Sequence, residues 1–140
     1  MSAKLYYIAP LVFECQENPI TLGDDKFRVT VPYDGEILGA LSGPAISGHI
    51  VNAGTGAGSS TDIQISNNTT GRDYFTTEPA FEVDDADGSG RALLSGGMLN
   101  GRPTFRQNDV LALDVDGLPT NSDSAQMTIT LLCGFWREVD

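Results

Sequence analysis

The chain has 140 residues, a length that favours one domain able to bury its own hydrophobic core. Nineteen acidic and eight basic side chains give a formal net charge of -11, and the pI is near 4.2. Such a surface repels phosphate backbones and anionic lipid headgroups, so we expect no nucleic-acid partner and no membrane partner.

The first apolar stretch, residues 5–13, lacks the features of a secretion signal. Pro10 interrupts it, and no small-residue cleavage site follows. We therefore expect it to be part of the folded protein, made in a cytosol. In that compartment Cys15 and Cys133 are expected to be free, buried thiols, with a disulfide between the first and last strands as the alternative.

Alternation of apolar and polar residues, the pattern of half-buried strands, runs through the chain. It predicts a strand at residues 26–31. The dipeptide Asp34-Gly35 then predicts a tight hairpin turn into a returning strand at residues 36–43. Residues 48–53 and 61–67 are predicted to form a second pair of strands across a glycine-rich loop.

The same alternation assigns side chains to the core or to solvent. Side chains expected in the core are Ile63, Ile65, Leu111, Leu113, Val115, Met127, Ile129, Leu131, Cys133 and Phe135. Those expected to face water include Asp62, Gln64, Ser66 and Asp114. Leu132 and Trp136 are apolar although they lie opposite the core face of residues 126–136. The end of this last strand is therefore expected to be covered on both faces, by a second subunit or by the N-terminal segment.

The fold class expected from these patterns is all-β, an antiparallel β-sandwich or jelly roll. Shorter candidates at residues 79–83, 91–95 and 102–107 bring the total to about eight to ten strands, and helical periodicity is nearly absent. Residues 25–140 are expected to form the sandwich. Residues 1–24 are expected to form either an N-terminal arm or the first strand.

The stretch "FEVDDADGSGRALL" contains the one candidate metal site. Asp85, Asp87 and Ser89 stand at alternate positions before Gly90, as at the start of a calcium loop. An EF-hand loop that begins at Asp85 needs a carboxylate at its twelfth position, where Gly96 stands. The three residues are kept as a candidate Ca2+ site, and an acidic turn between strands is the favoured interpretation.

No group of residues meets the requirements of a catalytic site. Asp114 and Asp116 are expected on one face of a strand, about 7 Å apart, but nothing around them predicts the raised pKa that acid catalysis needs. His49, the only histidine, cannot alone form the usual zinc site, and no Gly-x-Ser-x-Gly motif is present. We therefore expect the chain not to be an enzyme and to need no cofactor, calcium being the one open case.

The order of motifs over residues 27–133 resembles that of small jelly-roll modules in tailed-phage virion proteins. "VTVPYDGEILGALSG" is followed by "TDIQISN", then by "PTFRQNDVLALDVDGLP", and finally by "MTITLLC". Asn108 stands where glycine is commoner before Asp109, a change that turn geometry tolerates.

This resemblance implies a virion structural protein that is assembled in the host cytoplasm. It implies above all a capsid decoration (cement) protein, a homotrimer that stabilises the head by binding the major capsid protein or another virion protein. Aromatic and large apolar side chains are the usual interface anchors. The interface residues expected are Tyr6, Tyr7, Leu11, Phe13, Leu132 and Trp136, and the alternative for each is the core of this chain.

The resemblance also implies an alternative, a tail or head fibre or receptor-binding module that recognises a host-surface glycan. Three loops would then form the glycan site, with calcium bridging sugar hydroxyls. Tyr74 and Phe75 are the aromatic side chains expected to stack on a sugar there.

Overall fold

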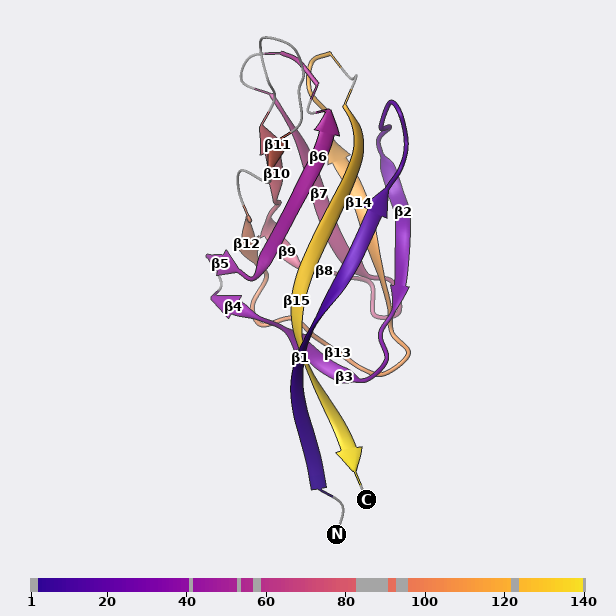
Figure 1. Ribbon diagram of the computed structural model, residues 1–140, viewed down its shortest axis with the longest axis vertical. Helices are drawn as coiled ribbons and strands as arrows, with labels where there is room; N and C mark the ends of the chain where they lie inside the picture. Colours follow the sequence, from indigo (N-terminus) through magenta and orange to yellow (C-terminus); the bar gives the residue numbers. More distant parts are fainter. Residues whose placement is uncertain are drawn as a thin grey trace.

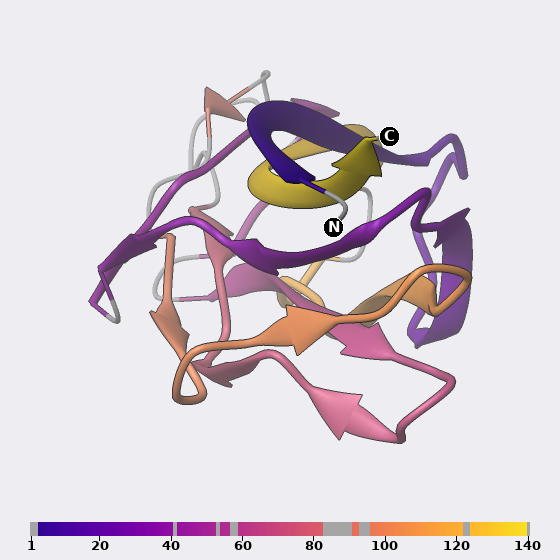
Figure 2. The same ribbon diagram turned by 90° about the horizontal axis from the view of Figure 1, so that it is seen from below.

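The computed structural model describes residues 3–40, 42–52, 54–56, 59–82, 91–92, 96–121 and 124–139. All regular structure in these residues is β, and every strand pairing is antiparallel. Two main sheets lie face to face, with the termini at one end of the molecule (Figures 1 and 2). The expected β-sandwich is confirmed. In this part of the chain no helix is long and apolar enough to span a membrane.

The first sheet is built around the long C-terminal strand β15 (Ala125–Val139). Strand β1 (Ala3–Cys15) pairs with one side of it over 13 residues. The other side pairs first with β6 (Ile46–Asn52) and then with β3 (Asp34–Ile37). The short strands β11 (Arg91–Ala92) and β13 (Thr104–Phe105) complete the six-stranded sheet. Residues 3–15, expected as an arm or a first strand, thus form a strand of the sandwich.

The second sheet has five strands and packs against the first. Its order is β10 (Ala80–Glu82), β7 (Ser60–Asn67), β14 (Val110–Gly117) and β2 (Gly23–Thr30), and β8 (Arg72–Asp73) also pairs with β7. Two smaller ribbons pair β9 (Phe75–Thr77) with β12 (Met98–Leu99), and β4 (Gly39–Ala40) with β5 (Gly43–Pro44).

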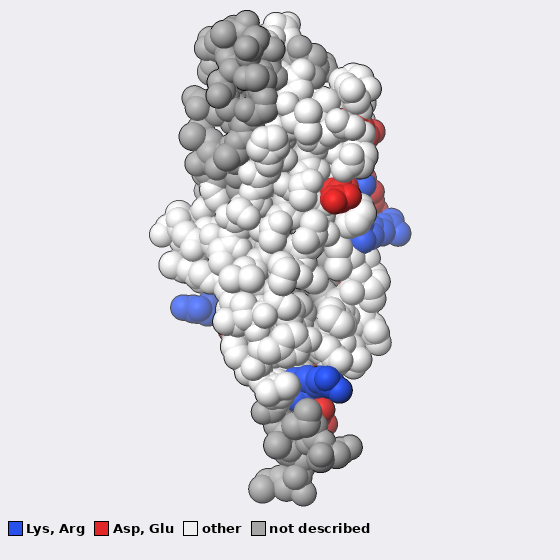
Figure 3. Space-filling model, viewed as in Figure 1, with Lys and Arg blue, Asp and Glu red and all other residues white. Residues whose placement is uncertain are grey.

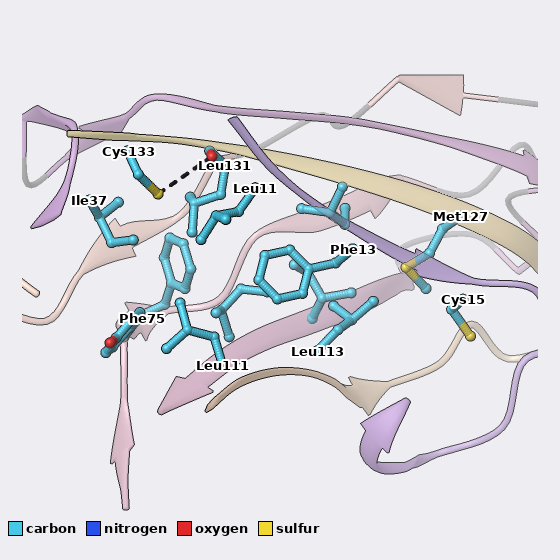
Figure 4. Close-up of a cluster of buried hydrophobic side chains, with 14 of the residues drawn as sticks. Leu11, Phe13, Cys15, Ile37, Phe75, Leu111, Leu113, Met127, Leu131 and Cys133 are labelled. Carbon is cyan, nitrogen blue, oxygen red and sulfur yellow. Dashed lines mark hydrogen bonds between the residues drawn. The ribbon is translucent and has the colours of Figure 1, made fainter. Parts of the chain in front are cut away.

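The hydrophobic core lies between the two sheets. All ten side chains expected there are at most 1% exposed. Figure 4 shows Leu11 and Phe13 of β1 among Leu111 and Leu113 of β14. Cys15 and Cys133 are free and buried, and burial raises the pKa of the Cys133 thiol to about 12.

Both predicted strand pairs are wrong. Strand β2 belongs to the five-stranded sheet and β3 to the six-stranded sheet, so the chain crosses the sandwich where a hairpin was expected. Gly35 lies within β3, opposite Phe135, and the ring of Phe105 occupies the space that a side chain there would need. Strands β6 and β7 are likewise in different sheets. Alternation identifies core-facing residues, but it carries no information about which strands are neighbours.

Candidate functional site

The most distinctive surface is the side of the six-stranded sheet that faces away from the core. Because successive side chains of a strand point to opposite faces, the register of β1, β15 and β6 determines which residues lie on this side. We call it the outer face. It comprises Tyr6, Ile8, Pro10, Val12, Glu14, Ala45, Ser47, His49, Val51, Thr128, Thr130, Leu132 and Trp136.

The middle of the outer face, from Tyr6 to Val12 along β1, is largely apolar, and the carboxylates of Glu14 and Glu36 lie on the same side of the sheet toward its margins. Figure 3 shows the surface over β6, β15 and β1 almost free of charge, with charged side chains at its margins. Eight large hydrophobic side chains are exposed among the described residues, and four of them, Tyr6, Ile8, Val12 and Val51, lie on this face at 42–58% exposure. Exposed apolar residues that stand alone are ordinary, but a contiguous patch marks a contact surface.

Tyr6 is held in place on the outer face by its neighbours. Its ring lies across Gly134, where an added Cβ would collide with it. The ring centroid is 5.3 Å from that of Trp136, and the hydroxyl donates a hydrogen bond to Glu36 Oε1 at 3.4 Å. A fixed, 43% exposed aromatic side chain loses little conformational freedom when a partner covers it, which favours a role as an interface anchor.

A groove accompanies the exposed row of β1 on the same side of the sheet. It has a volume of about 280 Å3 and runs where the start of β6 meets the middle of β15. Its lining residues are Pro44, Ala45, Ile46, Ser47, Thr130 and Leu132. The exposed row of β1 and this apolar groove, side by side on one face, form a surface suited to protein contact.

The predicted interface residues divide between the two sides of the sheet. Tyr6, Leu132 and Trp136 lie on the outer face. Leu11 and Phe13 lie in the core, which was the alternative given for them.

Tyr7 also lies on the core side of β1. It is half-buried and stacks on Phe135 with centroids 5.5 Å apart. Sequence reasoning missed Ile8, Pro10 and Val12. They could have been found from the sequence, because residues 5–13 are apolar on both faces when they are read as a strand, and only one of those faces can lie in the core.

The candidate calcium residues Asp85, Asp87 and Ser89 lie outside the described residues. Within the part of the chain that the structure describes, no three His, Cys, Asp or Glu side chains are arranged to hold a metal ion.

The three residues considered for catalysis are not gathered into one site. Asp114 is buried in β14, where it accepts hydrogen bonds from the backbone N–H of Asp25 at 2.8 Å and from Ser66 Oγ at 3.0 Å. Burial raises its pKa. Asp116 is exposed, and His49 lies on the outer face of the other sheet. Asp114 is therefore held inside the fold by hydrogen bonds, and the prediction that it faces water is wrong.

Gln64 and Ser66 are also buried, contrary to expectation. Gln64 exchanges two hydrogen bonds with the backbone of Phe75, at 2.9 and 3.0 Å, so the segment that follows β8 covers this side of β7. Tyr74 and Phe75 are themselves buried, which leaves neither ring free to stack on a sugar.

Solved structures to which the chain is similar include proteins of virus particles. The chain is similar to a protein in the acid-stable capsid of Helicobacter pylori bacteriophage KHP30, at 17% identity and a TM-score of 0.45, over 100% of this chain and 99% of that one. It is similar to a protein of the cyanophage Pam1 capsid, at 14% identity and a TM-score of 0.43, over 96% of this chain and 86% of that one. It is also similar to a protein of turnip yellow mosaic virus, at 10% identity and a TM-score of 0.38, over 99% of this chain and 84% of that one.

No protein-family model and no curated protein matches the sequence.

Proposed function

We propose that the chain is a virion structural protein of a tailed phage, specifically a homotrimeric capsid decoration (cement) protein that stabilises the head by bridging capsid subunits. The observation that carries this proposal is the outer face. A chain with a net charge of -11 keeps a largely apolar patch in the middle of this face, with four exposed large hydrophobic side chains, which indicates a function based on contact. The order of motifs over residues 27–133 supports the choice of a phage virion.

Such a protein would act mechanically. Binding across the junction between two capsid subunits removes apolar surface from water, at about 25 cal/mol per Å2 before the ordering costs are subtracted. To pull apart two capsid subunits that are joined in this way, their contacts with the bridging protein must be broken as well as their contacts with each other. The shell therefore resists internal pressure better than a shell without the bridging protein.

The test uses phage heads that lack the protein. We expect the purified chain to bind these heads and to raise the temperature at which they release DNA. Val51→Glu, which places a charge on the outer face, should weaken head binding about tenfold or more. Met98→Glu is the control, because Met98 is also exposed but lies on β12. Heads that neither bind the wild-type chain nor gain stability would refute the proposal.

A glycan-binding module of a fibre is the second candidate, and one surface feature favours it. Near the termini is a depression of about 410 Å3 lined by Tyr33, Asp34, Gln107, Trp136, Arg137 and Glu138. Aromatic rings beside carboxylate, amide and guanidinium groups offer both apolar contact and hydrogen bonds to a sugar. Glycan-array binding that Gln107→Ala abolishes, together with failure to bind heads, would favour this candidate over the first.

A further inference from the structure

We propose that Glu78 is a proton-operated latch for residues 76–80, the segment in which β9 passes into β10. With its proton bound, the carboxyl group of Glu78 holds this segment against the five-stranded sheet, and loss of the proton releases the segment. The inference goes beyond the proposed function and does not depend on it, because it concerns the other sheet of the sandwich.

The segment is attached to its surroundings through backbone contacts. The carbonyl oxygen of Pro79 accepts a hydrogen bond from the backbone N–H of Ile63 in β7, at 3.0 Å. On another side the backbone of Thr77 and Pro79 lies against Gly97, where an added Cβ would collide with it. The bond between Ile63 and Pro79 joins the segment to the sheet, so the Ile63 amide reports whether the segment is in place.

The carboxyl group of Glu78 lies among acids from neighbouring strands. Asp62 of β7 is paired with Ala80 of β10 on one side and with Gly117 of β14 on the other. Its carboxylate lies over Gly117, where an added Cβ would collide with it. Glu78 comes two residues before Ala80, and Asp116 comes one residue before Gly117. The register therefore brings the carboxyl groups of Glu78, Asp62 and Asp116 to one place.

This arrangement favours a proton on Glu78. The Oε2 atom of Glu78 is buried and accepts no hydrogen bond from the described residues, although buried oxygens are normally paired. A protonated Glu78 can donate a hydrogen bond to the carboxylate of Asp116. Burial and the negative charges of Asp116, Asp62 and Asp73 of β8 raise the pKa of Glu78.

No described cation neutralises this cluster of acids. In the described part of the chain the ion pairs are formed by Glu17 and by Asp25. Asp62 Oδ1 accepts a hydrogen bond from Ser60 Oγ at 2.6 Å, but a hydroxyl leaves the negative charge in place. An ionised Glu78 would therefore face like charges without compensation. Movement of the segment away from the sheet relieves this repulsion and returns the carboxylate to water.

The direction of the switch follows from these contacts. The attached segment binds the Glu78 proton more tightly than the released segment does, because the released carboxyl group lies in water. Attachment is therefore fully favoured below pH 4.5, and it is lost as the pH rises through the raised pKa of about 8. Between these two values each pH unit raises the ratio of released to attached segment by up to about tenfold.

The experiment is a titration of the whole chain by NMR, from about pH 5 to about pH 9. We expect the Ile63 amide resonance to move to the position of an unbonded N–H, with the same midpoint as the carboxyl carbon of Glu78. Its exchange with solvent should accelerate about tenfold or more beyond the intrinsic effect of pH. The amide of Leu113, which is buried in β14, reports on the whole fold and should keep its resonance position.

Three variants separate the latch from other effects of pH. Glu78→Gln keeps a hydrogen-bond donor for Asp116 and cannot ionise, so the Ile63 amide should stay bonded throughout. Asp116→Asn removes the neighbouring negative charge and should lower the midpoint by about one pH unit or more. Glu14→Gln is the control, because Glu14 is an exposed acid on β1, and it should leave the midpoint unchanged. Thermal melting confirms that each variant is folded.

Four results would overturn the latch. They are an Ile63 amide that does not respond to pH, an equal response in Glu78→Gln, an unchanged midpoint in Asp116→Asn, and a Leu113 amide that changes together with that of Ile63. The last result would mean that the whole fold opens. None of them concerns the binding of phage heads, so the proposed function stands or fails by its own test.

Discussion

Glu78 shows how a single residue makes the stability of this acidic chain depend on pH. Partial burial and the neighbouring carboxyl of Asp116 raise the pKa of Glu78 from 4.5 to about 8. The folded state therefore binds this proton more tightly than the unfolded state does. The resulting stability is complete below pH 4.5 and is lost as the pH rises through 8. We expect Glu78→Gln to raise the melting temperature at pH 8 and to change it little at pH 4.5.

Thermal melts of both proteins at pH 4.5, 6 and 8 provide the measurement. Glu14→Gln is the control, because Glu14 is an exposed acid at the end of β1 and its substitution removes one carboxyl group elsewhere on the chain. If both variants gain the same stability at pH 8, relief of general repulsion explains the result and the specific role of Glu78 is wrong.

At the scale of elements, substitutions in β1 test whether the N-terminal segment contributes to the stability of the folded protein. Phe13 is fully buried and packs edge-on against Phe27, with ring centroids 6.5 Å apart. Val12, next to it, is exposed on the outer face. We expect Phe13→Ala to lower the free energy of unfolding by about 3–5 kcal/mol. Val12→Ala should change it by less than about 1 kcal/mol. Denaturant titration of the two variants measures the difference, and equal small effects would mean that β1 is dispensable to the fold.

The strands themselves could be predicted from the sequence because alternation reflects burial of one face. That signal placed Leu111 and Ile129 in the core correctly. It failed for Gln64 and Asp114, which are polar and yet buried, because backbone groups of distant segments supply their hydrogen bonds. The polarity of a side chain does not reveal such partners in advance.

Which strands pair with one another could not be predicted from the sequence, for a related reason. In a sandwich the chain passes repeatedly between sheets, so neighbours in the sequence, such as β6 and β7, are separated by the core. The outer face depends on the same long-range pairing. Ile8 and Leu132 share a surface only because β1 lies along β15 in one particular register. Leu132 and Trp136 were nevertheless expected on the side opposite the core, because alternation along residues 126–136 places them there, whereas Tyr6 was named only as an aromatic residue of the N-terminal segment.

At the scale of the whole molecule, net charge and the outer face act in opposite directions on assembly. Each copy carries a charge of -11, whose repulsion reaches about 30 Å at 0.01 M salt and about 10 Å at 0.1 M. A contact between copies through the apolar middle of the outer face needs no ion pairs, and salt does not screen it. We therefore expect association to tighten as the salt concentration rises, the reverse of an interface held by ion pairs. Sedimentation equilibrium at about 0.01 M and about 0.3 M NaCl measures the two dissociation constants, and an oligomer that loosens in high salt would show that charged groups hold the copies together.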